Sequence, residues 1–261
     1  PRSFAHFEQK LKTQIHDLIS LMSTSLSSLE LYKISYFLGI ILNHYESSRS
    51  IQEKIQSFSH IEAWHDMIKF KYDTSKAEIN IVIGDKSWLR GHEHWGGVPR
   101  LIFTQSVSNA LSNILISKEN NQIPLIFGSS MSGKSSLLEL YSFIMGRFCY
   151  TASSFPNLQS YFIKQILIGA ALTGCSLLFK NINQFSMNNQ AKIFDYLREI
   201  TDDIQSGNSK FKVFNDDDAD INPDVSFMFT ATDKYSTEMT PQLRDFIRPI
   251  SLSITDIRKL A

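Results

Sequence analysis

The chain has few cysteines, no excess of either charge and no long apolar run. Cys149 and Cys175 are its only cysteines, which excludes a disulfide framework and is typical of a reducing compartment. Lys plus Arg and Asp plus Glu both total 26, so the chain lacks the basic excess with which proteins bind nucleic acid. The longest apolar stretch, residues 166–179, contains Gly and Thr and is shorter than a bilayer-spanning helix. We therefore expect no nucleic-acid partner and no membrane partner.

The composition is otherwise ordinary for a globular protein. Apolar residues make up 43% and charged residues 20%, and 261 residues are enough to bury one large core or two small ones. No signal peptide opens the sequence, and Pro1 stands where an initiator Met would be. We therefore expect the chain to be a piece of a longer protein.

The first part of the sequence has the apolar periodicity of helices. A Ser-rich break at residues 23–28 separates a first helix from a second apolar run, 29–42, and a third helical stretch continues to about residue 55. One face of the first helix carries Phe4, Phe7, Leu11, Ile15, Leu18 and Met22. Because no catalytic or binding motif is present here, we interpret these segments as a packed helical scaffold.

Two groups of potential metal ligands lack the pattern of a metal site. His92 and His94 have no acidic or Cys partner at zinc spacing, so we interpret them as surface or loop histidines. An acidic segment near residue 218 lacks the Gly and the distal Glu of a calcium-binding EF-hand loop, and we expect a solvated hairpin tip there. Its carboxylates are Asp216, Asp217, Asp218 and Asp220.

From residue 99 onwards, strand and helix patterns alternate, which is typical of a parallel α/β sheet. The strand candidates are residues 124–127, 148–151, 176–180, 226–230 and 249–253. The helix candidates between them are residues 135–145, 158–172 and 187–205. A single β-type run, residues 79–83, precedes this region.

The segment Gly128 to Ser135 matches the phosphate-binding P-loop G-x-x-x-x-G-K-[ST] at every fixed position, with an apolar strand before it and a helical run after it. Its glycines let backbone N–H groups turn toward phosphates, Lys134 reaches the β- and γ-phosphates, and the Ser135 hydroxyl is placed to coordinate Mg²⁺. The predicted nucleotide contacts are Gly128, Ser129, Ser130, Met131, Ser132, Gly133, Lys134, Ser135 and Ser136.

The strand that should carry the hydrolytic carboxylates lacks them. P-loop ATPases place an Asp at the end of a later strand, and AAA+ proteins follow it with a Glu that activates water. Here Lys180 and Asn181 occupy these positions, and an amide cannot take a proton from water. Losing a general base lowers the rate by roughly 10²–10⁴-fold. Asp195 and Glu199 lie on the solvated face of the next helix, so we expect no catalytic residue, with the Lys180 side chain directed toward the Mg²⁺ and γ-phosphate region.

Together these motifs resemble the dynein heavy chains, in particular the end of the linker and the first AAA+ module, over about residues 29–261. The markers are the segment PRLI at 99–102, the P-loop, and FIRP at 246–249. The resemblance implies a helical linker region, 1–96, followed by an AAA+ large α/β subdomain, 97–261, with a five-stranded parallel sheet of order 5-1-4-3-2. It also implies that Pro99, Leu101 and Ile102 line the adenine pocket and that Thr230 occupies the sensor position.

The resemblance further implies a function. It predicts a module that binds ATP or ADP, with Mg²⁺ held by Ser135 where the metal is bound, inside a cytoplasmic, cytoskeletal microtubule motor of the ciliary axoneme. The partners would be other modules of the same heavy chain, subunits of a dynein complex and microtubules. The segment FKNIN at 179–183 departs from the family's FDEFN, which predicts little or no hydrolysis.

Two alternatives remain open. One is a fully active dynein motor ATPase that receives its carboxylate from outside this chain. The other is a P-loop protein unrelated to motors, although no N-K-x-D motif of a GTPase and no Arg-rich lid of a small-molecule kinase is present.

Overall fold

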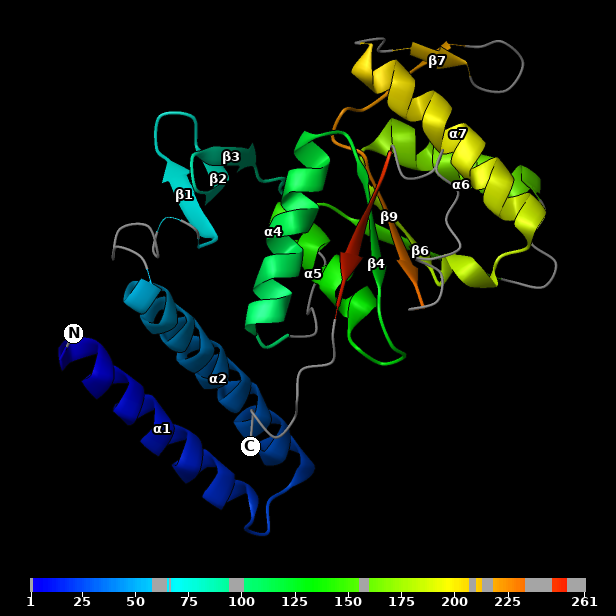
Figure 1. The fold of residues 1–261 in the computed structure, drawn as a ribbon. Helices are drawn as coiled ribbons and strands as arrows, with labels where there is room; N and C mark the ends of the chain where they lie inside the picture. Colours follow the sequence, from blue (N-terminus) through cyan, green and yellow to red (C-terminus); the bar gives the residue numbers. More distant parts are fainter. Residues whose placement is uncertain are drawn as a thin grey trace. The chain divides into compact units, whose positions relative to one another are not determined.

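The computed structural model describes residues 2–57, 65, 67–93, 101–154, 160–206, 210–212, 218–232 and 246–252 (Figure 1). The chain divides into two compact units. The first comprises residues 1–89 and 99–109, and the second comprises residues 90–98 and 110–261. The second unit contains the P-loop.

Two antiparallel helices, α1 (Arg2–Met22) and α2 (Ser28–Ser57), open the first unit. The Ser-rich break between them is confirmed, and a capping box explains where α2 begins. The Ser27 N–H and hydroxyl donate to the Glu30 carboxylate at 3.0 and 2.6 Å, and the Glu30 N–H donates back to Ser27 Oγ at 3.4 Å. The second and third predicted helical stretches are one continuous helix, α2.

The predicted apolar face of α1 is confirmed at Leu11, which is buried, but is wrong at Phe7, which is 46% exposed. The next residue, Glu8, is turned toward α2 instead. Its side chain is only 18% exposed. Its carboxylate pairs with the Lys12 ammonium at 2.8 Å and accepts a hydrogen bond from the Tyr45 hydroxyl of α2 at 3.5 Å.

A small antiparallel sheet follows α2, formed by β1 (Lys69–Asp73), β2 (Glu78–Ile83) and β3 (Lys86–Leu89) in the order β1-β2-β3. The predicted β-type run is β2, in which Ile81 and Val82 are buried. Its neighbours are not predicted from the sequence, because their side chains are mostly exposed and carry little apolar pattern. A two-residue turn with Gly84 in the left-handed region, at φ 59°, joins β2 to β3.

The second unit is built on a five-stranded parallel sheet of order β10-β4-β9-β6-β5. Numbered along the chain, these strands have the order 5-1-4-3-2, which confirms the predicted topology. Each strand lies within two residues of its prediction. The strands are β4 (Ile123–Phe127), β5 (Cys149–Ser153), β6 (Ser176–Lys180), β9 (Ser226–Ala231) and β10 (Ile247–Ser251).

Three predicted helices are confirmed as α5 (Lys134–Met145), α6 (Ser160–Thr173) and α7 (Met187–Gln205). A short 3-10 helix, η1 (Ile182–Gln184), lies between β6 and α7. The helix α4 (Gln105–Glu119) is an addition to the prediction, although Leu111, Ile114 and Leu115 are fully buried at helical spacing. The predicted hairpin is confirmed by β7 (Lys210–Lys212) pairing antiparallel with β8 (Asp218–Asp220), while its tip, with Asp216 and Asp217, lies outside the described residues.

Alternation along the strands divides the sheet into two faces. Phe179 of β6 and Phe229 of β9 stack at 5.5 Å between ring centroids and belong to one hydrophobic cluster with α6 and α7. Their chain neighbours Leu178, Lys180 and Thr230 therefore point to the other face of the sheet. The helix α5, which follows the P-loop, contacts β5, β6 and β9.

The carboxyl end of α5 is hydrogen-bonded to the segment that opens the second unit. The Gly91 N–H donates to the Met145 carbonyl at 2.8 Å, and the Arg90 guanidinium donates to the Ile144 carbonyl at 3.1 Å. The helix ends at Gly146, whose φ of 64° is left-handed. A Cβ at this position would lie 2.1 Å from the Gly91 carbonyl oxygen.

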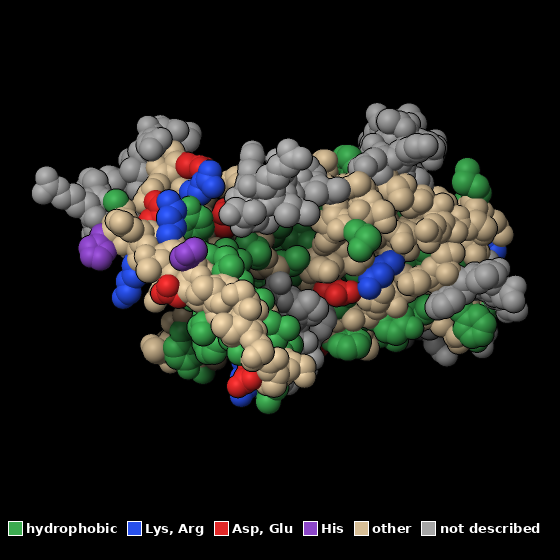
Figure 2. Space-filling model, turned by 90° about the horizontal axis from the view of Figure 1, so that it is seen from below, with side chains coloured by type: hydrophobic (Ala, Val, Ile, Leu, Met, Phe, Trp, Pro, Cys, Tyr) green, Lys and Arg blue, Asp and Glu red, His purple; other side chains and the backbone are tan. Residues whose placement is uncertain are grey.

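On the face drawn in Figure 2, acidic and basic side chains of the described residues are interspersed, without a patch of one sign. None of the helices in the described ranges has the length and apolar character needed to cross a bilayer. Within the same ranges no three His, Cys, Asp or Glu side chains gather as metal ligands. His92 is exposed, and His94 lies outside the described residues.

Candidate functional site

The predicted P-loop connects the end of β4, at Phe127, to the start of α5, at Lys134. Both motif glycines are required by the backbone. Gly133 has a φ of 87°, a left-handed conformation that side chains rarely adopt. A Cβ on Gly128 would lie 2.4 Å from the Leu252 carbonyl oxygen, so only glycine fits there. The loop thus turns sharply between strand and helix, as phosphate binding at a helix N-terminus requires.

The Lys134 side chain is folded into the loop. Only 7% of the residue is exposed, and its ammonium donates to the carbonyl oxygen of Gly128 at 2.9 Å and to that of Ser129. These acceptors lie on the loop itself, so the ammonium is held at the place where phosphate oxygens are expected. Phosphate oxygens are stronger acceptors for an ammonium than neutral carbonyls, because they carry charge.

Ser132, in the middle of the loop, has a buried hydroxyl that finds no hydrogen-bond partner among the described residues. A buried hydroxyl without a partner destabilises a protein by roughly 1–3 kcal/mol. A phosphate oxygen in the loop would satisfy it. The Met131 side chain, by contrast, is fully exposed, and the residue has a left-handed φ of 61°. Met131 therefore contributes its backbone, and not its side chain, to the loop.

The end of β6, where the sequence predicts that the hydrolytic carboxylates are missing, carries an ion pair. Lys180 Nζ lies 2.9 Å from Glu139 Oε1, with the two side chains 31% and 25% exposed. Glu139 is on α5, four residues after Ser135, and positions four apart lie on the same side of a helix. The Lys180 ammonium was expected to point toward the metal and the γ-phosphate. The structure instead directs it to a carboxylate one turn further along the P-loop helix.

Asn181, at the predicted second carboxylate position, is held by its backbone. Its φ of 52° is left-handed, a conformation that Asn tolerates better than most residues. The Asn181 N–H donates to Thr230 Oγ1 at 2.9 Å, and Thr230 is fully buried. A second contact joins the same two segments, since Asn183 Oδ1 accepts a hydrogen bond from the Thr232 N–H at 3.4 Å. The predicted sensor position is therefore tied to the end of β6.

The comparison with protein families identifies this arrangement. The model of the family described as the hydrolytic ATP binding site of the dynein motor region matches residues 91–261, which is more than half of the chain. The chain belongs to this family. No curated protein matches it. As part of a dynein motor region, the module is of an ATP-binding type and associates with other parts of a heavy chain.

Other predicted contacts of the dynein module lie away from the P-loop in the sequence. Leu101 and Ile102 are half-buried in the first unit, and the next residue, Phe103, donates its N–H to Asn43 Oδ1 of α2 at 2.8 Å. Pro99 lies outside the described residues. The role of these three residues at the adenine remains a prediction.

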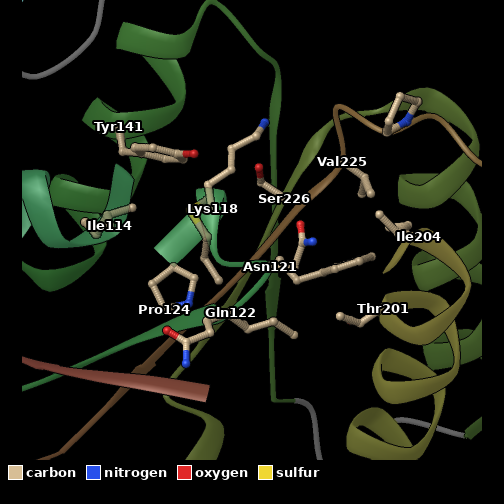
Figure 3. A pocket seen from close by; sticks show the side chains of 14 residues that line it. Ile114, Lys118, Asn121, Gln122, Pro124, Tyr141, Thr201, Ile204, Val225 and Ser226 are labelled. Atoms are coloured by element: carbon tan, nitrogen blue, oxygen red, sulfur yellow. The ribbon is translucent and has the colours of Figure 1, made fainter. Parts of the chain in front are cut away.

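A small cavity of about 80 Å³ lies at the other end of the dynein module's sheet (Figure 3). It borders the amino ends of β4 and β9, whereas the P-loop follows the carboxyl end of β4. Lys118, Tyr141 and Ser226 line it among mostly apolar neighbours. Burial raises the pKa of Tyr141 to about 12 and lowers the pKa of Lys118. This cavity is separate from the P-loop.

Glu139 is the residue of the site that was not predicted from the sequence. The available signal was its position, since it follows Ser135 by four residues in a helix whose neighbours Leu137, Leu138 and Leu140 are buried. A carboxylate that is mostly shielded from solvent is stabilised by a cationic partner. Only the packing of α5 on β6 shows that this partner is Lys180.

Proposed function

We propose that this dynein module binds ATP or ADP through its P-loop, hydrolyses ATP very slowly or not at all, and has a structural or regulatory role in a microtubule motor. The observation that carries the proposal is the end of β6, where the ion-paired Lys180 and the backbone-held Asn181 replace the two carboxylates.

Nucleotide binding is supported by the loop itself. The left-handed Gly133, the unpaired Ser132 hydroxyl and the folded Lys134 ammonium all fit a chain of phosphates. The positive end of α5 adds to their attraction. The proposed contacts are residues 128–136, with Ser135 as the side chain that would contact Mg²⁺ where the metal is bound. Pro99, Leu101 and Ile102 are the proposed adenine contacts.

Weak hydrolysis is supported by the state of the nearby carboxylates. Glu139 is neutralised by the Lys180 ammonium, and Asp195 and Glu199 are exposed on α7. The Asn181 amide can hydrogen-bond a water molecule but cannot take its proton. A site without a general base is expected to be slower by roughly 10²–10⁴-fold.

Single-turnover hydrolysis tests this proposal directly. Radiolabelled ATP is bound to the parent protein, and phosphate release is followed in the wild type, in Asn181→Glu and in Glu139→Lys/Lys180→Asp/Asn181→Glu. The triple variant restores both carboxylates and keeps an opposite charge beside residue 180. We expect slow release in the wild type and faster release in the triple variant. Wild-type turnover as fast as that of the triple variant would overturn the proposal.

A fully active motor ATPase is the second candidate, and the hydrolytic description of the matched family favours it. In that case the base comes from outside this chain, and rapid wild-type turnover in the same experiment would support it. The family match excludes the other alternative, a P-loop protein unrelated to motors.

We also propose the wider setting that the dynein family suggests. The division into a linker region, 1–96, and a large subdomain, 97–261, belongs to this proposal. The partners are other modules of the same heavy chain, subunits of a dynein complex and microtubules. The location is the cytoplasm and its cytoskeleton, in particular the ciliary axoneme. Fluorescent tagging of the parent protein tests the location, and a signal confined to non-ciliary structures would contradict the axonemal assignment.

A further inference from the structure

The residues at the end of β6 do not fit the Mg²⁺ ion that normally accompanies a nucleotide at a P-loop. In P-loop NTPases the metal is held by the hydroxyl of the last motif residue and by a strand-end Asp. The hydroxyl is present here as Ser135. The strand-end residue is Lys180, whose ammonium offers only donors and cannot ligate a cation.

Glu139 does not compensate for this loss. Its carboxylate is the acceptor of the Lys180 ammonium at 2.9 Å, and the two groups are mostly shielded from solvent. A divalent cation on Glu139 would have to displace this ammonium and would then lie beside it. Like charges at such short distance repel strongly where water is partly excluded.

The backbone on both sides of the pair is held in place. Lys180 ends a strand whose neighbour β9 is fully buried at Thr230, and the next residue, Asn181, donates its N–H to that threonine. Glu139 is set by α5, which packs on β5, β6 and β9. A rearrangement that turned the Lys180 side chain away would therefore leave Glu139 without its cation.

From this disagreement we infer that nucleotide binding by the module does not depend on a divalent metal, because the strand end offers no metal ligand and the Glu139 carboxylate is already paired with Lys180. The inference rests on the proposed nucleotide binding and specifies the form of the ligand. It predicts that free ADP or ATP binds as tightly as the magnesium complex.

The first measurement is calorimetric titration of the parent protein with ADP, in excess Mg²⁺ and in excess EDTA. We expect the two dissociation constants to agree within about threefold, whereas a site that depends on its metal should lose about tenfold or more, equivalent to about 1.4 kcal/mol. The second measurement uses Mn²⁺ as the probe. After gel filtration, the protein–ADP complex is expected to retain ADP and to show no bound Mn²⁺ by electron paramagnetic resonance.

The reversed pair Glu139→Lys/Lys180→Asp provides the contrast. It keeps an ion pair between α5 and β6 but places a carboxylate at the strand end, so we expect it to retain Mn²⁺ with ADP and to bind ADP more weakly in EDTA. The matched control Lys192→Asp makes the same substitution on α7 and should behave as the wild type. Thermal unfolding of each variant checks that it folds, and the wild-type titrations decide the question if the reversed pair does not.

The outcomes separate the two claims. Equal affinity with and without metal, with no retained Mn²⁺, supports the inference. Wild-type binding that is lost in EDTA, or Mn²⁺ retained by the wild type, overturns the inference and leaves the proposed nucleotide binding intact. Absence of ADP binding under both conditions overturns the proposed function and the inference with it.

Discussion

At the scale of single residues, Lys134 is the one charged side chain that is buried among the described residues. Its ammonium is turned into the P-loop and bonded to backbone carbonyls. Burying a charge is unfavourable unless it is compensated, and neutral carbonyls compensate it less well than phosphate oxygens. The loop therefore keeps a cation positioned for an anionic ligand.

We expect Lys134→Ala to abolish measurable ATP and ADP binding, with a loss of roughly 100-fold or more, because the charge-assisted hydrogen bonds that the ammonium would donate to the phosphates are removed. Calorimetric titration of both nucleotides measures this. The control is Lys192→Ala on α7, which should bind normally. An affinity of Lys134→Ala equal to that of the wild type would show that the P-loop is not the binding site.

Thr230 has a structural role that its sensor position does not reveal. Its hydroxyl oxygen accepts the Asn181 N–H at 2.9 Å inside the protein. We expect Thr230→Val, which keeps the shape and removes the acceptor, to lower the free energy of unfolding by about 1–3 kcal/mol.

Urea unfolding measures this change, and Thr201→Val is the matched control. Thr201 is also buried, but its hydroxyl donates to the Leu197 carbonyl within α7, at 2.7 Å, where the helix already supplies a donor. Equal losses in the two variants would show that the bond between Asn181 and Thr230 contributes nothing specific.

At the scale of helices and strands, two glycines of the second unit differ in whether the fold leaves room for a side chain. Gly146 ends α5 in a left-handed conformation, with the Gly91 carbonyl where a Cβ would be. Gly169, in the middle of α6, has nothing within 4 Å of that point.

We expect Gly146→Ala to lower the free energy of unfolding by at least about 1–2 kcal/mol from its backbone conformation alone. Gly169→Ala should raise it by about 0.5–1 kcal/mol, because alanine favours the helix. Urea unfolding of the two variants side by side is the measurement. Stabilisation by both, or destabilisation by both, would contradict this description of the two helices.

The strands and the P-loop could be predicted from the sequence, whereas the ion pair could not. Buried apolar runs locate β4, β6 and β9, and the predicted ranges of β5 and β10 also lie within two residues of the strands. Motif spacing locates Lys134. The order of the strands came from the resemblance to dynein heavy chains. Lys180 and Glu139 are 41 positions apart, and their contact depends on how α5 packs on the sheet. The strands β1 and β3 were missed because most of their side chains face solvent.

At the scale of the whole molecule, a buried phenol and a buried thiol make the free energy of unfolding depend on pH in the alkaline range. Burial raises the pKa of Tyr141 from 10.0 to about 12 and the pKa of Cys149 from 9.0 to about 11. Both groups are neutral when protonated, so the unfolded chain loses these protons first as the pH rises. Their contribution to stability is therefore complete below pH 9.0 and is lost progressively toward pH 12.

We expect the free energy of unfolding to fall steadily above pH 9.0 and the fall to be smaller in Tyr141→Phe. Urea unfolding at a series of pH values measures both slopes. Tyr161→Phe is the control, since Tyr161 is 55% exposed and should leave the slope unchanged. A slope in Tyr141→Phe equal to that of the wild type would assign the alkaline loss to other groups.

The hydrogen bonds at the carboxyl end of α5 affect how this helix can move. The helix has 12 residues and is therefore roughly 18 Å long. Its first turn continues the P-loop, and its last turn is bonded to Arg90 and Gly91. Because a helix is stiff along its axis, its first and last turns move together. A shift of the first turn on phosphate binding would therefore also move the segment at Arg90 and Gly91.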